Sequence, residues 1–284
     1  MKLLCVGDVM VETVVHVAAD VGDGDEAQGV FETRVGGQAL NVARVFHRLG
    51  GQSLFYAAVG QDEWAGWLRR QLRQEGLKFR FQKTAKPTGM VISIASPQDR
   101  TMYAQRGANE MLDLSQLKKF KLKNEDGLYF SGYLMNNPQG ITQLQRAIEN
   151  HNRNLTVIDT PPVGVMNKVG VDRFLQACAG IQVFLTNQDE AAVLTRKSNL
   201  KEMLELLANR FPMVIIKQGA KGCSLADQSE VVHVPTTPLK NINATGAGDA
   251  FCGGFLYALS QGQSSRAAAQ FAHEVAAKVI SREA

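Results

Sequence analysis

The sequence predicts an α/β fold, with a mostly parallel central sheet flanked by helices and a small β lid. Apolar Val/Ile/Leu runs of strand length alternate with stretches of helical periodicity through most of the 284 residues. Uninterrupted apolar runs are typical of strands covered on both faces, and their alternation with helices is typical of parallel crossover connections. The length suits one large domain, which we expect to span residues 1–284.

The elements follow this alternation in order along the chain. Apolar runs predict strands over 3–7, 53–60, 127–133, 155–159, 182–186 and 213–217. Apolar residues at helical spacing predict helices over 39–49, 63–76, 140–151, 190–195 and 200–211. Residues 247–282 are predicted to form two helices broken at QGQS.

Two segments depart from this alternation. Residues 13–35 alternate in strand fashion around a Gly/Asp turn, and residues 89–106 form a second hairpin pattern with its turn at Pro97 to Asp99. We expect these strands to form a lid over one end of the main body; the alternative is a simple extension of the main sheet. Because a lid exposes strand edges that can pair with a second copy, we also expect a homodimer formed through it.

The composition argues against several classes of protein. Four cysteines without CxxC spacing do not suggest a disulfide framework or a zinc site, and they are typical of a cytoplasmic protein. No stretch approaches 18 uncharged apolar residues, so no membrane partner is expected. The formal charge is +4 and the basic residues are dispersed. We interpret their one cluster, KKFKLK at 118–123, as a solvated helix end rather than a nucleic-acid patch.

One stretch, NATGAGDAFCGGF at 243–255, joins small residues to an apolar, helix-prone run. Gly246, Ala247 and Gly248 precede Asp249. A helix N-terminus offers unpaired N–H groups and a partial positive charge, and small residues let a phosphate approach them closely. An N-cap role would explain Asp249 alone, but a cap does not need three small residues. We therefore interpret 246–248 as an anion cradle, although neither a dinucleotide fingerprint nor a P-loop motif is present.

The stretch ATGAGDAFCGGF closely resembles the C-terminal signature of the ribokinase-like (PfkB) family of carbohydrate and nucleoside kinases. Far upstream, VGGQALNVARVFHRLGG at 35–51 is similar to the family's N-terminal glycine-rich signature. Shorter matches occur in the family's order, namely VGQDEWAG, PTG, RGAN, FSGYL, NQDE and KQGAKG. The resemblance covers essentially the whole chain and implies the ribokinase-like, Rossmann-like three-layer fold.

The resemblance implies transfer of the γ-phosphoryl group of ATP to a hydroxymethyl group of a small sugar. A nucleoside is the alternative acceptor, and a non-catalytic sugar or nucleotide sensor is the rival from another class. By the same resemblance, Asp249 is the base that accepts the hydroxyl proton. The backbone N–H groups of Gly246, Ala247 and Gly248 would form the anion hole that stabilises the developing charge.

The resemblance also implies residues for ATP and Mg²⁺. Asn187 and Glu190 match an Asn-x-x-Glu motif that organises Mg²⁺ around the phosphates, with Glu190 acting through water. Without the resemblance, NQDE is simply a helix N-terminus with favourable acids. Gly219 matches a glycine whose backbone lies against the ATP phosphates, where Lys217 is a candidate to add a charge. A strand followed by a tight turn explains the glycines of KQGAKG equally well, but not Lys217.

The acceptor site is expected to come from the first half of the chain. Gly36 and Gly37 would let a polyhydroxylated molecule lie against the backbone, and Asn41 would hydrogen-bond its hydroxyls. Glu12 stands where the family commonly has an Asp that binds sugar hydroxyls. Arg106 is a candidate to contact the acceptor or the lid, with a surface charge as the alternative.

The chain departs from the family in two motifs. GGQALN replaces the GGKGAN of many ribokinases, and the change of Lys to Gln38 and of Gly to Ala39 weakens the case for ribose itself. Asn243-Ala244 replaces the usual Asp-Thr before TGAGD, so we do not expect potassium activation. No pair of basic residues near the N-terminal motif suggests a sugar phosphate as the acceptor.

Overall fold

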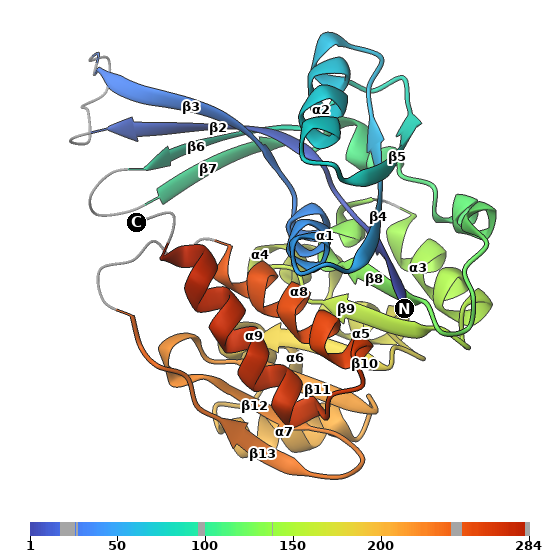
Figure 1. Ribbon diagram of the computed structural model, residues 1–284, viewed down its shortest axis with the longest axis vertical. Coiled ribbons are helices and arrows are strands. Elements are labelled where there is room, and N and C mark those ends of the chain that lie inside the picture. The colour runs from blue at the N-terminus through green and yellow to red at the C-terminus, as the bar shows by residue number, and fades with distance from the viewer. Residues whose placement is uncertain (18–25, 27, 96–99, 138, 240–245, 282–284) are drawn as a thin grey trace.

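The computed structural model describes residues 1–17, 26, 28–95, 100–137, 139–239 and 246–281. Within them, a nine-stranded sheet forms the centre of the molecule, in the order β13-β12-β11-β10-β9-β8-β1-β4-β5 (Figure 1). Neighbours from β11 to β5 pair in parallel, while β12 and β13 are added antiparallel at one edge. The strands are β1 Lys2–Val6, β4 Gln52–Val59, β5 Lys78–Lys83, β8 Gly127–Ser131, β9 Leu155–Asp159, β10 Val183–Asn187, β11 Met213–Lys217, β12 Cys223–Ala226 and β13 Val231–Val234.

Helices cover both faces of the central sheet, because its strands are apolar on both sides. In β1, Leu3 and Cys5 belong to one core, whereas Leu4 and Val6 belong to the other, and all four are fully buried. The first core is closed by α1 Gln38–Arg48, α2 Glu63–Gln74, α8 Ala247–Ser260 and α9 Ser265–Ile280. The second is closed by α3 Gly140–Asn150, α4 Val163–Val169, α5 Val171–Ala177, α6 Gln188–Thr195 and α7 Leu200–Ala208.

The predicted strands and helices of the main body are all present, with bounds within three residues of those expected. The short or edge elements β5, α4, α5, β12 and β13 were not predicted, because they carry too little apolar periodicity. Four short 3₁₀ segments are also present, η1 Gly107–Met111, η2 Leu114–Phe120, η3 Gly132–Asn136 and η4 Gly219–Lys221. In the described part of the chain, no helix is both long and apolar enough to cross a membrane.

The two hairpin segments form a separate four-stranded sheet in the order β3-β2-β6-β7, which we call the lid sheet. Its strands are β2 Met10–Val17, β3 Gly29–Gly36, β6 Met90–Ala95 and β7 Arg100–Gln105. Figure 1 shows it standing apart from the central sheet, so the alternative of a simple extension of the main sheet is wrong. The predicted Gly/Asp turn and the turn at Pro97 to Asp99 lie outside the described residues.

Candidate active site

Polar side chains gather at the carboxyl ends of the central parallel strands. Ser131 ends β8, Asp159 ends β9, Asn187 ends β10 and Lys217 ends β11. Because parallel strands end at the same edge of a sheet, these groups lie together, where open α/β sheets bind their ligands. The start of α8 reaches the same edge, since the Nζ atom of Lys217 lies 3.6 Å from the position that a Cβ atom on Gly248 would take.

Among the described residues, no side chain caps the first turn of α8. Gly246 is its N-cap residue, with a φ of +80° in the left-handed region that favours glycine, and Asp249 lies within the first turn. The N-cap alternative for Asp249 is therefore wrong. Side chains cap α2, α6, α7 and α9, whereas α1, α3, α4 and α5 resemble α8 in having no side-chain cap hydrogen bond. The free N–H groups and the dipole of α8 make its start suitable for an anion. Asn243, on which the expectation about potassium rests, lies outside the described residues.

The Asp249 carboxylate is held by one oxygen. Its Oδ2 accepts a hydrogen bond of 2.7 Å from Nδ2 of Asn41, and no hydrogen bond from the described residues reaches Oδ1. Burial raises the pKa of this carboxyl to about 7, opposed by the bond from Asn41 and by the charge of Lys217, and supported by the charge of Asp159. A base with a pKa near neutrality is well matched to accept a hydroxyl proton.

A cavity of about 410 Å³ has walls from both the lid sheet and the strand ends. Asp249 lines it together with four residues predicted to bind the acceptor, namely Glu12, Gly36, Gly37 and Arg106. Asn41, also predicted to bind the acceptor, is not among its lining residues, and its amide is directed to Asp249 instead. We call this cavity the acceptor cavity.

Two ion pairs fix the charged walls of the acceptor cavity. Nε of Arg34 donates to Oε2 of Glu12 at 2.9 Å, so a basic residue does stand beside the N-terminal motif, but it is paired with a carboxylate. Nη1 of Arg106 donates to Oδ2 of Asp8 at 2.7 Å, and its guanidinium lies over the ring of Tyr133, 4.4 Å from the ring centroid. The alternative of Arg106 as a surface charge is therefore wrong.

Gly37 is required by the fold itself. Its φ is +138°, and a Cβ atom there would lie 2.2 Å from the backbone carbonyl oxygen of Asp8. The close approach that the sequence signalled is thus made by the chain's own backbone. Gly36 is also restricted, since a Cβ atom would lie 3.2 Å from Oε2 of Glu12.

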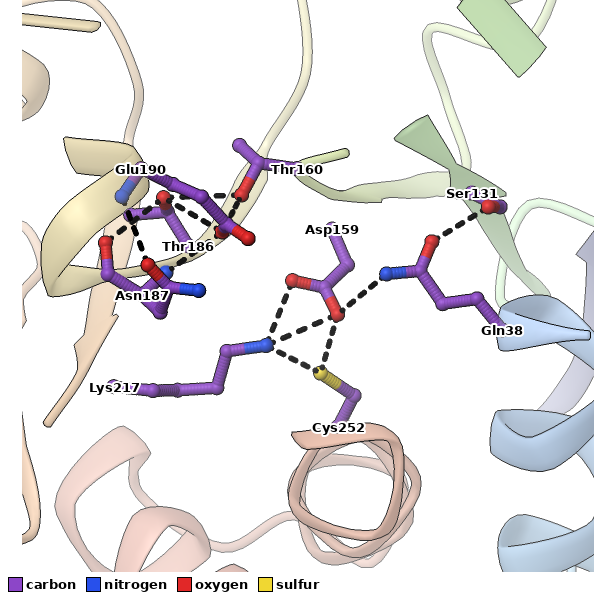
Figure 2. A network of polar contacts seen from close by, with 9 residues as sticks. All are labelled: Gln38, Ser131, Asp159, Thr160, Thr186, Asn187, Glu190, Lys217 and Cys252. Atoms are coloured by element: carbon purple, nitrogen blue, oxygen red, sulfur yellow. Dashed lines mark hydrogen bonds and ion pairs between the residues drawn. The ribbon is translucent and has the colours of Figure 1, made fainter. Parts of the chain in front are cut away.

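Lys217 is committed to an ion pair below the start of α8. Its Nζ lies 2.8 and 3.0 Å from the two carboxylate oxygens of Asp159 (Figure 2). Cys252 and Gln38 also hydrogen-bond Oδ2 of Asp159, at 3.3 and 3.2 Å. Burial alone would lower the pKa of Lys217, but the charge of Asp159 raises it above its ordinary value, so the ammonium stays charged. The sequence analysis missed Asp159, although a polar residue ending an apolar strand was a signal for it.

Asn187 and Glu190 form a reciprocal cap on α6. The side chain of Asn187 accepts from the Glu190 N–H at 2.8 Å, and Oε2 of Glu190 accepts from the Asn187 N–H at 3.0 Å (Figure 2). The helix N-terminus interpretation of NQDE is therefore confirmed. Glu190 also accepts a hydrogen bond from Thr160 and lines the acceptor cavity. The role of this pair in ATP and Mg²⁺ binding stays a prediction.

A second cavity, of about 340 Å³, lies on the other side of the α8 start, and we call it the nucleotide cavity. Ala247, Gly248, Lys217 and Gly219 line one part of it, and side chains of α8, α9 and the segment 236–239 after β13 line most of the rest. In that second part, Nε2 of His273 is buried without a hydrogen-bond partner among the described residues. The sequence analysis missed His273. Because that atom has almost no accessible surface, His273 contributes its ring to the cavity wall rather than this nitrogen.

The protein-family model described as "pfkB family carbohydrate kinase" matches residues 1–284 of this chain. The chain belongs to this family. Family membership makes it a sugar or nucleoside kinase, in agreement with the resemblance found in its motifs.

Individual pfkB relatives are similar over nearly their whole length. The "Adenosine kinase" of Dictyostelium discoideum is 25% identical, with 98% of this chain and 94% of the relative covered. The "Ribokinase" of Bacillus subtilis is 23% identical, with 97% and 92% covered. The structure of ribokinase from Giardia lamblia superposes with a TM-score of 0.84 over 100% of this chain and 93% of that one, at 18% identity. This last likeness shows the ribokinase-like fold.

Proposed function

We propose that this pfkB kinase transfers the γ-phosphoryl group of ATP to a hydroxymethyl group of a small sugar. The observation that carries the proposal is the position of the first turn of α8 between two cavities. Asp249 lines the acceptor cavity, whereas Ala247 and Gly248 line the nucleotide cavity. The base and the free N–H groups therefore face the two substrates from one helical turn.

In the proposed reaction, the acceptor hydroxyl lies beside the free Oδ1 of Asp249. As its oxygen forms a bond to the γ-phosphorus, the bond from that phosphorus to the bridging oxygen of ADP breaks. The hydroxyl proton passes to Asp249, and ADP takes the electrons of the broken bond. The N–H groups of Gly246, Ala247 and Gly248 stabilise charge on the phosphoryl oxygens, which suits a reaction that depends on positioning and electrostatics.

Mg²⁺ fits this site only through water and phosphate oxygens. The described residues contain no group of three side chains that could hold a metal by themselves. Glu190 is the carboxylate that we expect to act on it through water, with Asn187 beside it at the start of α6. Mg²⁺ keeps much of its hydration and binds few protein carboxylates, and when bound it would neutralise phosphate charge.

The walls of the acceptor cavity also support a nucleoside as the acceptor. Asp8, which follows β1 of the central sheet, and Glu12, on β2 of the lid sheet, supply carboxylates for hydroxyl groups. On the lid side, Val91, Met102 and Ala104 form an apolar wall that a planar base would cover better than a sugar. We therefore keep a nucleoside as the second candidate acceptor. Both candidate acceptors, the sugar and the nucleoside, are uncharged molecules.

An ADP-release screen across aldoses, ketoses, deoxy-keto acids and nucleosides tests the proposal directly. We expect turnover with at least one neutral polyol acceptor. Activity confined to phosphorylated sugars would contradict the choice of acceptor. Asp249→Asn should lower turnover by about 10²- to 10⁴-fold while ATP binding persists. A non-catalytic sensor would instead give no ADP release with any acceptor and an unchanged ligand response in the variant.

We further propose that two copies associate through the outer face of the lid sheet. The alternation of β2, β3, β6 and β7 places Phe31, Ile92 and Tyr103 on the face opposite the acceptor cavity, exposed at 69%, 46% and 65%. An exposed apolar sheet face of this kind is suited to a second copy. Light scattering should show a dimer, and Phe31→Ser should shift it toward monomer. A monomer at micromolar concentration would contradict this.

We propose that the protein acts in the cytoplasm. Its cysteines Cys5, Cys178, Cys223 and Cys252 are all buried free thiols. Free thiols are typical of a reducing compartment. Fractionation of the native host, probed with an antibody to the chain, tests this.

A further inference from the structure

The amide of Asn41 lies between the catalytic carboxylate and an arginine. Its Nδ2 donates to Oδ2 of Asp249 at 2.7 Å, and its Oδ1 accepts from Nη1 of Arg44 at 3.3 Å. Asn41 and Arg44 are three residues apart on α1, so they share one face of that helix. The amide is therefore contacted at both ends by the protein, before any substrate is considered.

Arg44 is itself firmly held. Its Nε and Nη2 donate to the two carboxylate oxygens of Glu75 at 2.7 and 2.6 Å, and its Nη1 donates to the carbonyl oxygen of Val35 at 2.7 Å. A guanidinium is a planar fork of donors with no acceptor, and a bidentate carboxylate fixes its plane. Arg44 can thus face only the oxygen of the Asn41 amide, which leaves the NH₂ group directed to Asp249.

We propose that Arg44 and Glu75 are positioning residues that orient Asn41 so that its NH₂ group holds one oxygen of Asp249 and leaves the other for the acceptor hydroxyl. The inference rests on the proposed function, in which Asp249 is the base. Without Arg44, the amide can rotate and present its oxygen to the carboxylate, which removes a hydrogen bond to the charged form and adds repulsion. The base then becomes harder to ionise.

The other ionisable groups near Asp249 are the same with and without Arg44. Those that interact with it electrostatically come from β8, η3, β9, β11 and α8, and they are Tyr129, Tyr133, Asp159, Lys217 and Cys252. Further charged groups share the acceptor cavity with it, and they are Asp8, Glu12, Arg106 and Glu190. Arg44 and Glu75 line neither the acceptor cavity nor the nucleotide cavity. If replacing Arg44 or Glu75 changes the pKa of Asp249, the effect is therefore transmitted through Asn41.

The test is a titration of the aspartate carboxyl carbons by NMR in the full chain, with the Asp249 signal assigned by its loss in Asp249→Asn. In Arg44→Met we expect the pKa of Asp249 to rise by about one unit, as for the loss of one hydrogen bond to a charged group. With an acceptor from the screen, we expect kcat at pH 7 to fall about fivefold, because the ionised fraction of Asp249 falls from about one half to about one tenth, and its acidic limb to move to higher pH. The acceptor KM should change less than about twofold, because Asn41 does not line the acceptor cavity.

Three variants make the result decisive. Lys2→Met removes another partly buried ion pair, with Asp126, remote from the site, and should leave the titration and kcat unchanged. Glu75→Gln keeps a neutral partner for Arg44 and should shift the pKa of Asp249 in the same direction by a smaller amount. This variant provides the test if Arg44→Met does not fold. In an Asn41→Ala background, Arg44→Met should add no further shift, because the two act through one contact.

An unchanged Asp249 titration in both Arg44→Met and Glu75→Gln would overturn the proposal. So would an equal shift from Arg44→Met in the presence and in the absence of the Asn41 amide. Absence of turnover with every acceptor in the unmodified protein would contradict the proposed function instead. In that case the titration still decides whether Arg44 positions Asn41.

Discussion

Asp249→Asn should make the protein more stable at alkaline pH, although it removes the proposed base. The pKa of the folded Asp249 carboxyl is raised from 3.8 to about 7, chiefly by burial. A carboxyl with a raised pKa binds more protons in the folded chain than in the unfolded chain, so wild-type stability falls as pH rises from about 4 to about 7. The amide of an asparagine has no such cost.

The magnitude follows from the size of the pKa shift. At about 1.4 kcal/mol for each pH unit, the folded chain loses at most about 3 kcal/mol from this group between pH 4.5 and pH 8. Because Asp249 is only partly buried by surface area, solvent screens part of this cost, and we expect about 1–2 kcal/mol. Urea unfolding of both proteins at the two pH values measures it as the change in their difference in free energy of unfolding.

Asp172→Asn is the matched control, since Asp172 is a surface aspartate whose side chain is 76% exposed. The free energy of unfolding of Asp172→Asn should stay within about 0.5 kcal/mol of the wild-type value across the same pH interval. If the stability difference for Asp249→Asn is the same at pH 4.5 and pH 8, the carboxyl is not desolvated as described. The argument for a base matched to neutral pH would then fail as well.

Three further substitutions have expected outcomes. Gly37→Ala should destabilise the chain by more than about 2 kcal/mol in urea, because φ is +138° and the new Cβ would collide with the Asp8 carbonyl oxygen. Lys217→Met should cost about 3–5 kcal/mol by leaving buried Asp159 unpaired, and adding Asp159→Leu should recover part of that loss; no recovery would contradict the ion-pair argument. His273→Ala should raise the KM for ATP about threefold with little change in kcat, as measured by steady-state kinetics, because its ring forms part of the wall of the nucleotide cavity. An unchanged KM would exclude His273 from contact with ATP.

Periodicity and small-residue motifs in the sequence were sufficient to predict the main body and the position of Asp249 at a helix start. The apolar runs 155–159 and 213–217 form strands with the predicted bounds. A strand that is buried on both faces needs apolar residues at nearly every position, so its sequence is easily recognised. Gly246, Ala247 and Gly248 predicted an anion cradle at a helix start, because their lack of bulk is a local property; the helix start is present, and the anion stays a prediction. The four-residue strands β12 and β13 and the seven-residue helices α4 and α5 were missed, because so few residues carry no readable period.

The sequence by itself determined the alternation of strands and helices, the lid strands, and the placement of Asp249 in the first turn of a helix. Only the tertiary structure decided which side chains meet. Asn41 reaches Asp249 across 208 residues, and Lys217 reaches Asp159 across 58. Such pairings depend on strand order and on the rotation of each helix against the sheet, which local spacing does not encode. For that reason Asn41 was expected to bind the acceptor, whereas its amide hydrogen-bonds Asp249.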